Sequence, residues 1–208
     1  MVALLFAATA INYVDRQMIA VLKPTLSAEF NWSESDFAGM MFWFQMAYAI
    51  GYLSFGKIVD TLGARLGYTV AIVIWTISHM AHGFATGITS FAVARFGLGV
   101  GESGNFPAGI RAVNDWFPQK ERALAIGVFN AGANVGAIVT PLLVLWFDWR
   151  MAFFVTGLFG IIWLAVWWAV YRHPDEHPRV TPGELGRLEA TVSYGVVARC
   201  EFIQNSMI

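Results

Sequence analysis

Residues 1–22, MVALLFAATAINYVDRQMIAVL, form an apolar run that carries an acid and a base side by side beyond its midpoint. A helix needs about 20 predominantly apolar residues to cross a bilayer, and this run has that length. It is not a secretory signal, because it lacks a basic leading region and the same pattern recurs downstream. The recurrence predicts six membrane-spanning helices, over residues 1–22, 37–57, 66–86, 88–112, 122–147 and 151–171.

The composition of the 208-residue chain indicates an all-α membrane protein, since 57% of the residues are hydrophobic and 13% are charged. Soluble domains carry roughly 25% charged residues, so a soluble enzyme of this composition would precipitate. The net charge of −1 gives no basis for a nucleic-acid partner. Cys200 is the only cysteine, which excludes an internal disulfide framework and a cysteine-based zinc site. We expect no metal and no cofactor.

Polar segments separate the spans and divide the chain into two regions. We expect residues 1–172 to form the six-helix transmembrane domain. Residues 173–208 begin as a charged, proline-rich stretch, which indicates a cytoplasmic loop followed by a truncated or aberrant tail. Within the first polar break, Ser33 followed by Asp36 predicts a capping box at the start of the second helix.

The basic residues between the spans predict the orientation, because cytoplasmic loops are enriched in Lys and Arg. If the N-terminus is cytoplasmic, two of these residues, Lys23 and Arg150, lie outside. Nine then lie inside, namely Lys57, Arg65, Arg111, Lys120, Arg122, Arg172, Arg179, Arg187 and Arg199. We therefore expect a multi-pass protein of the inner (cell) membrane with both termini in the cytoplasm.

Four charged residues lie within the predicted spans: Asp15 and Arg16 in the first, and Arg95 and Glu102 in the fourth. A charge at the centre of a bilayer costs at least about 2.5–3.5 kcal/mol, so these side chains must face a polar cavity, one another, or both. A purely structural ion network is one interpretation. Packed apolar groups hold helices together as well or better, which favours a binding site instead.

Helix geometry predicts how these charges are directed. Adjacent residues point about 100° apart, so Asp15 and Arg16 cannot face the same neighbour. Tyr13 lies on the side of Arg16, and we expect both to line a cavity while Asp15 turns toward another helix, with Arg95 as its counter-ion. Arg95 and Glu102 share one helix face about 10 Å apart. A carboxyl group in a dry site can take up a proton near neutral pH, which makes Asp15 and Glu102 candidate proton carriers.

Other polar residues in the spans permit two interpretations each. Tyr48 could give its hydroxyl to a sugar or be a core aromatic residue. Asn130 and Asn134 are one turn apart and could bind a polyol or join two helices. His79 and His82 lack a third metal ligand, so we expect packing or interface roles for them. The glycine pairs 97/101 and 132/136 predict close helix contacts.

Several motifs resemble a known family. GKIVDTLGARLG, residues 56–67, resembles the signature loop of the major facilitator superfamily, with Gly56, Asp60, Gly63 and Arg65 as its motif residues. NYVDRQ at 12–17, the stretch from GVGESGNFPAGIR to NAGANVGA at 99–137, and HPRVTPGEL at 177–185 resemble the anion:cation symporter family within it. The resemblance is strongest to hexuronate and aldonate transporters and covers about residues 2–190.

The resemblance implies roles for these residues. It implies that Arg16 binds the carboxylate of a sugar acid, such as glucuronate, galacturonate or galactonate, between Tyr13 and Tyr48. It implies that Asp15 and Glu102 take part in proton coupling and that Arg95 tunes them. Asn134 matches a polar position of the fifth helix. The coupling ion is expected to be H⁺, with Na⁺ as an alternative. No nucleophile–base pair occurs in the spans, so the chain is not expected to be an enzyme.

The resemblance also implies an architecture of twelve spans in two halves, with the site between them. This chain matches the N-terminal half, a six-helix bundle of 3+3 inverted repeats. Its expected partners are a small organic anion, the lipid bilayer and a missing C-terminal six-helix half. We expect an incomplete or frameshifted proton-coupled symporter that works by alternating access. The alternative is a non-transporting half-transporter or membrane sensor that binds an organic anion.

Overall fold

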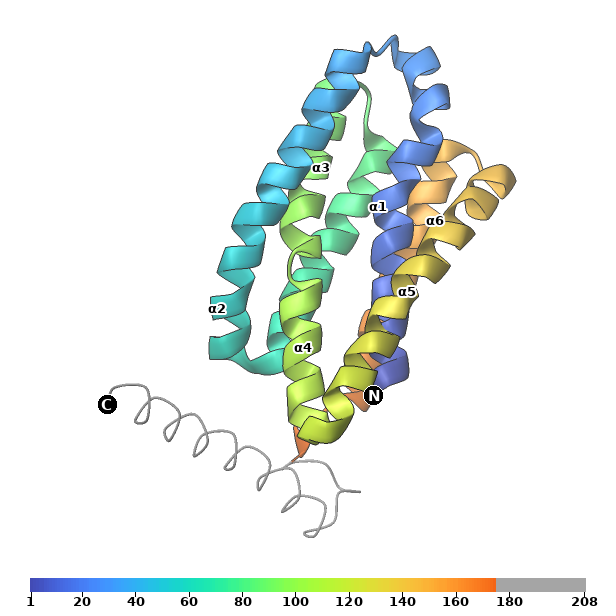
Figure 1. Cartoon of the computed structure of the whole chain (residues 1–208). Helices are drawn as coiled ribbons and strands as arrows, with labels where there is room; N and C mark the ends of the chain where they lie inside the picture. Colours follow the sequence, from blue (N-terminus) through green and yellow to red (C-terminus); the bar gives the residue numbers. More distant parts are fainter. Residues whose placement is uncertain (175–208) are drawn as a thin grey trace.

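The computed structural model describes residues 1–174 as a bundle of helices that run up and down beside one another (Figure 1). The predicted tail therefore lies almost wholly outside the described residues. The elements in chain order are α1 (Val2–Phe30), α2 (Glu34–Ala81), the 3-10 turn η1 (His82–Phe84), α3 (Ile88–Glu102), α4 (Asn105–Trp116), α5 (Gln119–Trp146) and α6 (Trp149–Val170). Within residues 1–174 there is no strand.

The second and third predicted spans are joined in α2, which reverses direction at Gly63. Gly63 has φ 74° and ψ 170°, a backbone conformation that only glycine adopts readily. At the start of α2 the predicted capping box is present. The Asp36 carboxylate accepts a hydrogen bond of 2.9 Å from the Ser33 N–H, and the Ser33 hydroxyl accepts one of 3.2 Å from the Asp36 N–H.

Two elements differ from the predicted spans. α1 continues past residue 22 to Phe30 with Pro24 inside it. The fourth span is broken into α3 and α4 at Ser103 and Gly104, directly after Glu102. A Cβ atom on Gly104 would collide with the side chains of Ala71 and Phe55, so the break brings this backbone close to α2.

Three stretches of residues 1–174 are long and apolar enough to cross a membrane by length and composition: Glu34–Phe84, Gln119–Trp146 and Trp149–Val170. α1 carries an amide, an acid and a base near its middle, which lowers its hydropathy. α3 and α4 are 15 and 12 residues long, and each alone is too short for a span.

The core consists of two apolar clusters with a charged layer between them. The cluster nearer the N-terminus includes Leu5, Tyr68 and Trp167. The other, near the α1–α2 connection, includes Met18, Leu26, Phe91 and Phe153. Along α1, Asp15 and Arg16 follow Ala8 of the first cluster and precede Met18 of the second, and along α3, Arg95 lies between Phe91 and Leu98. The apolar clusters hold the helices that place these charges.

Close helix contacts at glycine hold α1 against α5 and α2 against α3, as the glycine pairs predict. A Cβ on Gly132 would meet the backbone of Phe6 and Ala10, and one on Gly136 would meet Ala10 and Tyr13. On α3, a Cβ on Gly101 would meet the backbone of Trp75. These contacts limit the movement of α1, the helix that carries Asp15 and Arg16.

Replacing Gly63 with alanine is expected to lower the free energy of unfolding by about 1–3 kcal/mol, because its φ is strained for any residue with a Cβ. No atom lies within 4 Å of a Cβ built at Gly63, so the loss reports backbone strain alone. Gly56→Ala is the control, since Gly56 is helical and equally free of neighbours. Chemical unfolding in detergent measures both. Equal stability of the two variants would contradict the assignment of strain to Gly63.

Candidate functional site

The centre of the candidate site is an ion pair between α1 and α3. Arg16 Nε donates to Glu102 Oε2 at 2.9 Å. The Glu102 side chain is fully buried, whereas 26% of the Arg16 side chain is exposed. Neither Arg16 Nη2 nor Glu102 Oε1 has a hydrogen-bond partner among the described residues. The pair thus keeps a nitrogen of the arginine and an oxygen of the acid without hydrogen-bond partners in the described chain.

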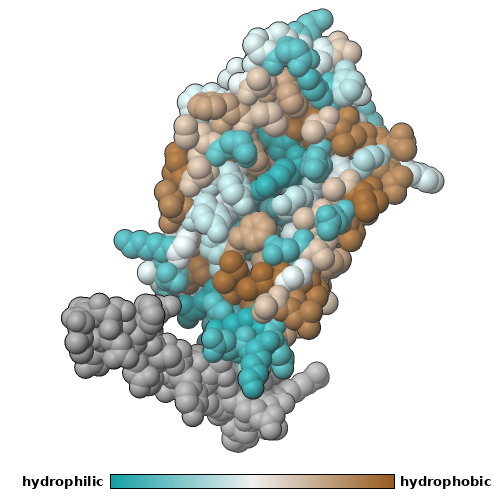
Figure 2. Space-filling view, viewed as in Figure 1, coloured by the Kyte–Doolittle hydropathy of each residue, from teal (hydrophilic) through white to brown (hydrophobic). Residues whose placement is uncertain are grey.

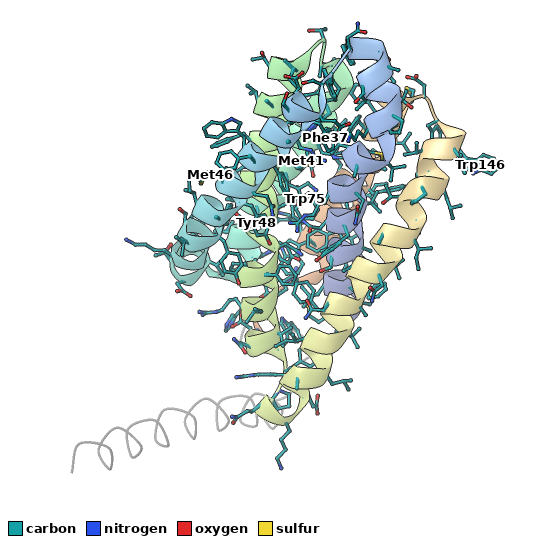
Figure 3. All side chains as sticks on the ribbon, turned by 45° about the horizontal axis from the view of Figure 1, so that its top comes forward. Phe37, Met41, Met46, Tyr48, Trp75 and Trp146 are labelled. Carbon is teal, nitrogen blue, oxygen red and sulfur yellow. The ribbon has the colours of Figure 1, made fainter. Side chains whose placement is uncertain are left out.

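Aromatic rings surround the Arg16 guanidinium. Its Cζ lies 4.7 Å from the ring centroid of Tyr48 and 5.4 Å from those of Tyr13 and Phe44. Cation–π contacts of this kind orient an arginine without using its hydrogen-bond donors. In Figure 3, Tyr48 points inward from α2 toward α1, whereas Trp146 points away from the bundle. The structure therefore brings Tyr13, Arg16 and Tyr48 together.

Arg95 supports α1 from beneath the site. It is 1% exposed and donates a hydrogen bond of 3.1 Å from Nη2 to the backbone carbonyl of Arg16. Its Cζ lies 5.2 Å from the Phe44 ring centroid. The expected ion pair between Arg95 and Asp15 is not found within the described chain. Arg95 instead contacts the backbone of Arg16, the residue after Asp15.

Asp15 faces away from Arg16, toward α2. Its Oδ2 accepts a hydrogen bond of 2.8 Å from the Trp75 indole N–H, and its Oδ1 lies 3.1 Å from His79 Nε2. The sequence predicted a packing or interface role for His79. Its position four residues after Trp75 on the same helix face was the available signal, but which helix that face meets depends on the tertiary packing.

A further buried polar contact, which sequence reasoning missed, lies nearer the N-terminus of α1. The Tyr68 hydroxyl donates to Asn105 Oδ1 at 2.5 Å, and Asn105 Nδ2 donates to Thr9 Oγ1 at 3.3 Å. These bonds join α2, α4 and α1.

The asparagines of α5 are not brought into this cluster. Asn130 and Asn134 are exposed, and they lie on the side of α5 opposite Gly132 and Gly136, which contact α1. No hydrogen bond in the described part of the chain joins Asn134 to Arg16 or Glu102. The substrate-facing role expected for Asn134 therefore has no contact to support it.

The loop motif connects α2, α4 and α6 at the end of the bundle that holds the N-terminus (Figure 1). Asp60 Oδ1 lies 3.8 Å from Arg111 Nη1, and Arg111 Nε donates to Asp115 at 3.1 Å. Burial and the adjacent Asp115 carboxylate raise the pKa of the Tyr171 phenol, which therefore stays protonated and donates to Asp115 at 3.0 Å.

The other charged residue of the motif, Arg65, reaches α6. Its Nη2 donates to the Trp168 carbonyl at 2.9 Å, and its Cζ lies 4.4 Å from the Trp168 ring centroid. Gly56 has no atom within 4 Å of a built Cβ, so nothing in the described chain requires glycine there. Gly63 and Arg65 thus have structural explanations, and Gly56 has none.

Hydrophilic residues gather in the middle of one face of the bundle, between apolar flanks (Figure 2). α1, α2, α4 and α5 form this face (Figure 1). Within residues 1–174, no group of three or more His, Cys, Asp or Glu side chains is placed to hold a metal ion. The arrangement suits a small anion, since it offers a partly exposed arginine beside a buried acid.

The sequence matches the Major Facilitator Superfamily over residues 5–201. The chain therefore belongs to this superfamily of membrane transporters, which confirms the predicted all-α membrane fold. Membership of a transporter family also agrees with the expectation that the chain is not an enzyme.

The curated relatives are transporters of sugar acids by name. The chain is 35% identical over 188 residues to the hexuronate transporter of Escherichia coli strain K12, covering 88% of this chain and 44% of that protein. It is 31% identical to the galacturonate transporter of Dickeya chrysanthemi, with coverage of 88% and 54%. It is 34% identical to a probable L-galactonate transporter of Escherichia coli strain K12, with coverage of 90% and 42%. The chain spans about half the length of these relatives.

Solved structures share the fold. The inward-open xylose transporter XylE from Escherichia coli matches with a TM-score of 0.73 at 15% identity, over 99% of this chain and 55% of that one. A bacterial homologue of the human lysosomal transporter Spinster matches with a TM-score of 0.67 at 21% identity, over 83% and 44%. Identity this low shows a common architecture and leaves function to the site.

Proposed function

We propose that the chain is the N-terminal, anion-binding half of a proton-coupled sugar-acid transporter. The observation that carries this proposal is the Arg16–Glu102 pair, in which a partly exposed arginine on the hydrophilic face is held by a fully buried acid. Arginine binds carboxylates through a planar fork of donors, and Arg16 Nη2 has no partner in the described chain. The curated relatives, which are named for hexuronate, galacturonate and galactonate, support a sugar acid as the substrate.

The geometry supports a mechanism for coupling. While Glu102 is ionised, it competes with a substrate carboxylate for Arg16. A proton on Glu102 Oε1, which has no hydrogen-bond partner among residues 1–174, would neutralise this competitor without breaking an existing hydrogen bond. Arg16 could then pair with the carboxylate of the sugar acid, while Tyr13 and Tyr48 contact the sugar. Proton and anion would therefore bind together, and Arg95 would keep the backbone of Arg16 in place.

In the proposed arrangement the bundle spans the inner membrane. The N-terminus and the Gly63 reversal then lie on the cytoplasmic side. Basic residues support this orientation, since Lys57 and Arg65 flank the Gly63 reversal, and Arg111, Lys120 and Arg122 flank the α4–α5 connection. Both connections lie at the end of the bundle that holds the N-terminus (Figure 1). A second six-helix half would cover the hydrophilic face and complete the cavity. The two halves would then rock about the loaded site to give alternating access.

The test is uptake of labelled glucuronate, galacturonate and galactonate into proteoliposomes. The vesicles hold the chain alone, or the chain together with a separately expressed second half of the hexuronate transporter. We expect accumulation against a gradient when the outside is acidic, and none of glucose under the same conditions. Accumulation that requires Na⁺ and ignores the pH gradient would contradict proton coupling.

A partly exposed Arg16 held by a fully buried Glu102 also fits a second function, which is anion binding without transport. The chain could bind an organic anion in the membrane without moving it, as a sensor does. Binding of labelled glucuronate to the chain in nanodiscs, with no uptake in either vesicle preparation, would support the sensor. Uptake with the added second half would contradict it.

A further inference from the structure

The Asp15 carboxyl group forms a second polar site, behind the Arg16–Glu102 pair. Asp15 Oδ1 lies 3.1 Å from His79 Nε2, and the two side chains are 1% and 0% exposed. Asp15 Oδ2 accepts from the Trp75 indole N–H at 2.8 Å. Figure 3 shows Trp75 between α2 and α1, inside the bundle. Both carboxylate oxygens of Asp15 thus lie close to side chains of α2, and only Oδ2 accepts a hydrogen bond in the described chain.

The other contacts of His79 determine where its hydrogen atoms lie. The Thr156 hydroxyl donates to the Ala152 carbonyl of its own helix at 2.9 Å, so its oxygen accepts from His79 Nε2 at 2.7 Å. Nε2 therefore carries a hydrogen that Thr156 accepts, and Asp15 Oδ1 lies 3.1 Å from the same nitrogen without accepting a hydrogen bond. The lone pair of the ring is then on Nδ1, a buried atom without a hydrogen-bond partner in the described chain. One further proton can be added there.

Charged and titratable groups act on this pair from the elements packed around it. His82, at the start of η1, has its ring centroid 6.1 Å from that of His79. Arg95 and Glu102 act from α3. α6 contributes the Thr156 hydroxyl and the ring of Phe153, whose centroid lies 5.1 Å from the His79 ring.

We propose that Asp15 and His79 form one proton-holding site, in which His79 rather than Asp15 alone binds the proton. Loading adds one proton to Nδ1 and changes the net charge of the pair from −1 to zero. The hydrogen on Nε2 either stays on the imidazolium or moves across the 3.1 Å contact to Asp15 Oδ1. The second case gives a carboxylic acid and a neutral imidazole. The use of this proton in transport rests on the proposed function, whereas the shared site does not.

His82 continues the site toward the end of the bundle opposite the N-terminus. Its Nδ1 donates to the Ser78 carbonyl at 2.9 Å, which leaves the lone pair on Nε2. That Nε2 is buried and has no partner among residues 1–174. Asp15, His79 and His82 therefore form a row of proton acceptors. This row is separate from the partly exposed Arg16.

The experiment is NMR of the purified chain in lipid nanodiscs with ¹⁵N-labelled histidine. The chain has four histidines, and His79→Gln and His82→Gln assign two of them. We expect the His79 signals to change with pH as the site takes up its proton. Asp15→Asn removes the negative partner, so the midpoint should fall by more than about one pH unit, a tenfold loss of proton affinity.

Trp75→Phe removes only the indole donor to Asp15 and tests the same coupling with the opposite sign. The carboxylate is then less stabilised, so the His79 midpoint should rise. Glu102→Gln, which changes the other buried acid, should move the midpoint less than Asp15→Asn does. His79 signals that stay constant across the pH range, or the same midpoint in the Asp15 and Trp75 variants as in the wild type, would show that His79 only holds α2 against α1 and α6.

Uptake distinguishes this site from the proposed function. In the vesicle assay, His79→Gln should lose accumulation driven by the pH gradient and keep exchange of labelled for unlabelled sugar acid. Equal loss of both would overturn the proton role and indicate a structural one. The NMR titration needs neither substrate nor transport, so a chain that moves no sugar acid could still show the shared proton.

Discussion

Replacing Arg16 with alanine is expected to weaken sugar-acid binding by about a hundredfold, or about 3 kcal/mol. The variant loses the donors for the substrate carboxylate and leaves Glu102, which is fully buried, without its partner. Equilibrium binding of labelled glucuronate to the chain in nanodiscs measures the loss. Arg16→Lys keeps the charge but not the planar fork, so we expect an intermediate loss of about tenfold.

Two comparisons separate the loss of the carboxylate site from a general loss of structure. Lys120→Ala removes an exposed cation outside the site and should leave binding unchanged. In Arg16→Ala combined with Glu102→Gln, the unpaired acid is gone, so stability should recover while binding stays weak. An Arg16→Ala chain that binds or accumulates glucuronate like the wild type would remove Arg16 from the site.

The directions of the charges in α1 could be predicted from helix geometry alone. Adjacent residues in a helix point about 100° apart, so Asp15 and Arg16 cannot both face the cavity. In the structure Asp15 is 1% exposed and contacts α2, while 26% of the Arg16 side chain is exposed. The spacing of glycines also predicted the close contacts of α1 with α5, because this pattern depends on the surface of a single helix.

The partners of these charges could not be predicted, since they depend on which helices become neighbours. Arg95 was matched to Asp15 by charge, yet it donates to the backbone of Arg16. His79 meets Asp15 because the second half of α2 lies beside α1, a relation between segments 60 residues apart and more. A neutral imidazole also carries no charge, so the matching of opposite charges in the sequence could not predict the contact between His79 and Asp15.

The predicted helix ends differ from the observed ones where the length needed to cross a bilayer was used to set the length of the helix. The first predicted span ends at residue 22, but a proline removes only one backbone hydrogen bond, and α1 continues past Pro24 to Phe30. Pro107, the third residue of α4, has no N–H to donate to the Ser103 carbonyl, which favours the break after Glu102. The break also brings Gly104 close to Ala71 and Phe55, a contact that a single sequence does not reveal.

Replacing Glu102 with glutamine is expected to abolish accumulation driven by a pH gradient while exchange of sugar acid survives. Glutamine keeps the shape of the side chain and removes the carboxylate that competes for Arg16. In the wild type, binding should strengthen by up to about tenfold for each unit by which the pH falls through the titration of Glu102. The variant should bind with the same affinity, within about twofold, at every pH in that range.

The sign of this effect follows from the competition for Arg16. A carboxylate at residue 102 weakens anion binding at high pH, so Glu102→Gln should bind at high pH as the wild type does at low pH. Glu34→Gln is the matched control, because it removes an exposed carboxylate that pairs with Lys23 at 2.6 Å and should leave the pH dependence intact. Full driven uptake by Glu102→Gln would clear Glu102 of coupling. If its binding stayed pH-dependent and that of Asp15→Asn did not, the coupling proton would belong to the Asp15–His79 site instead.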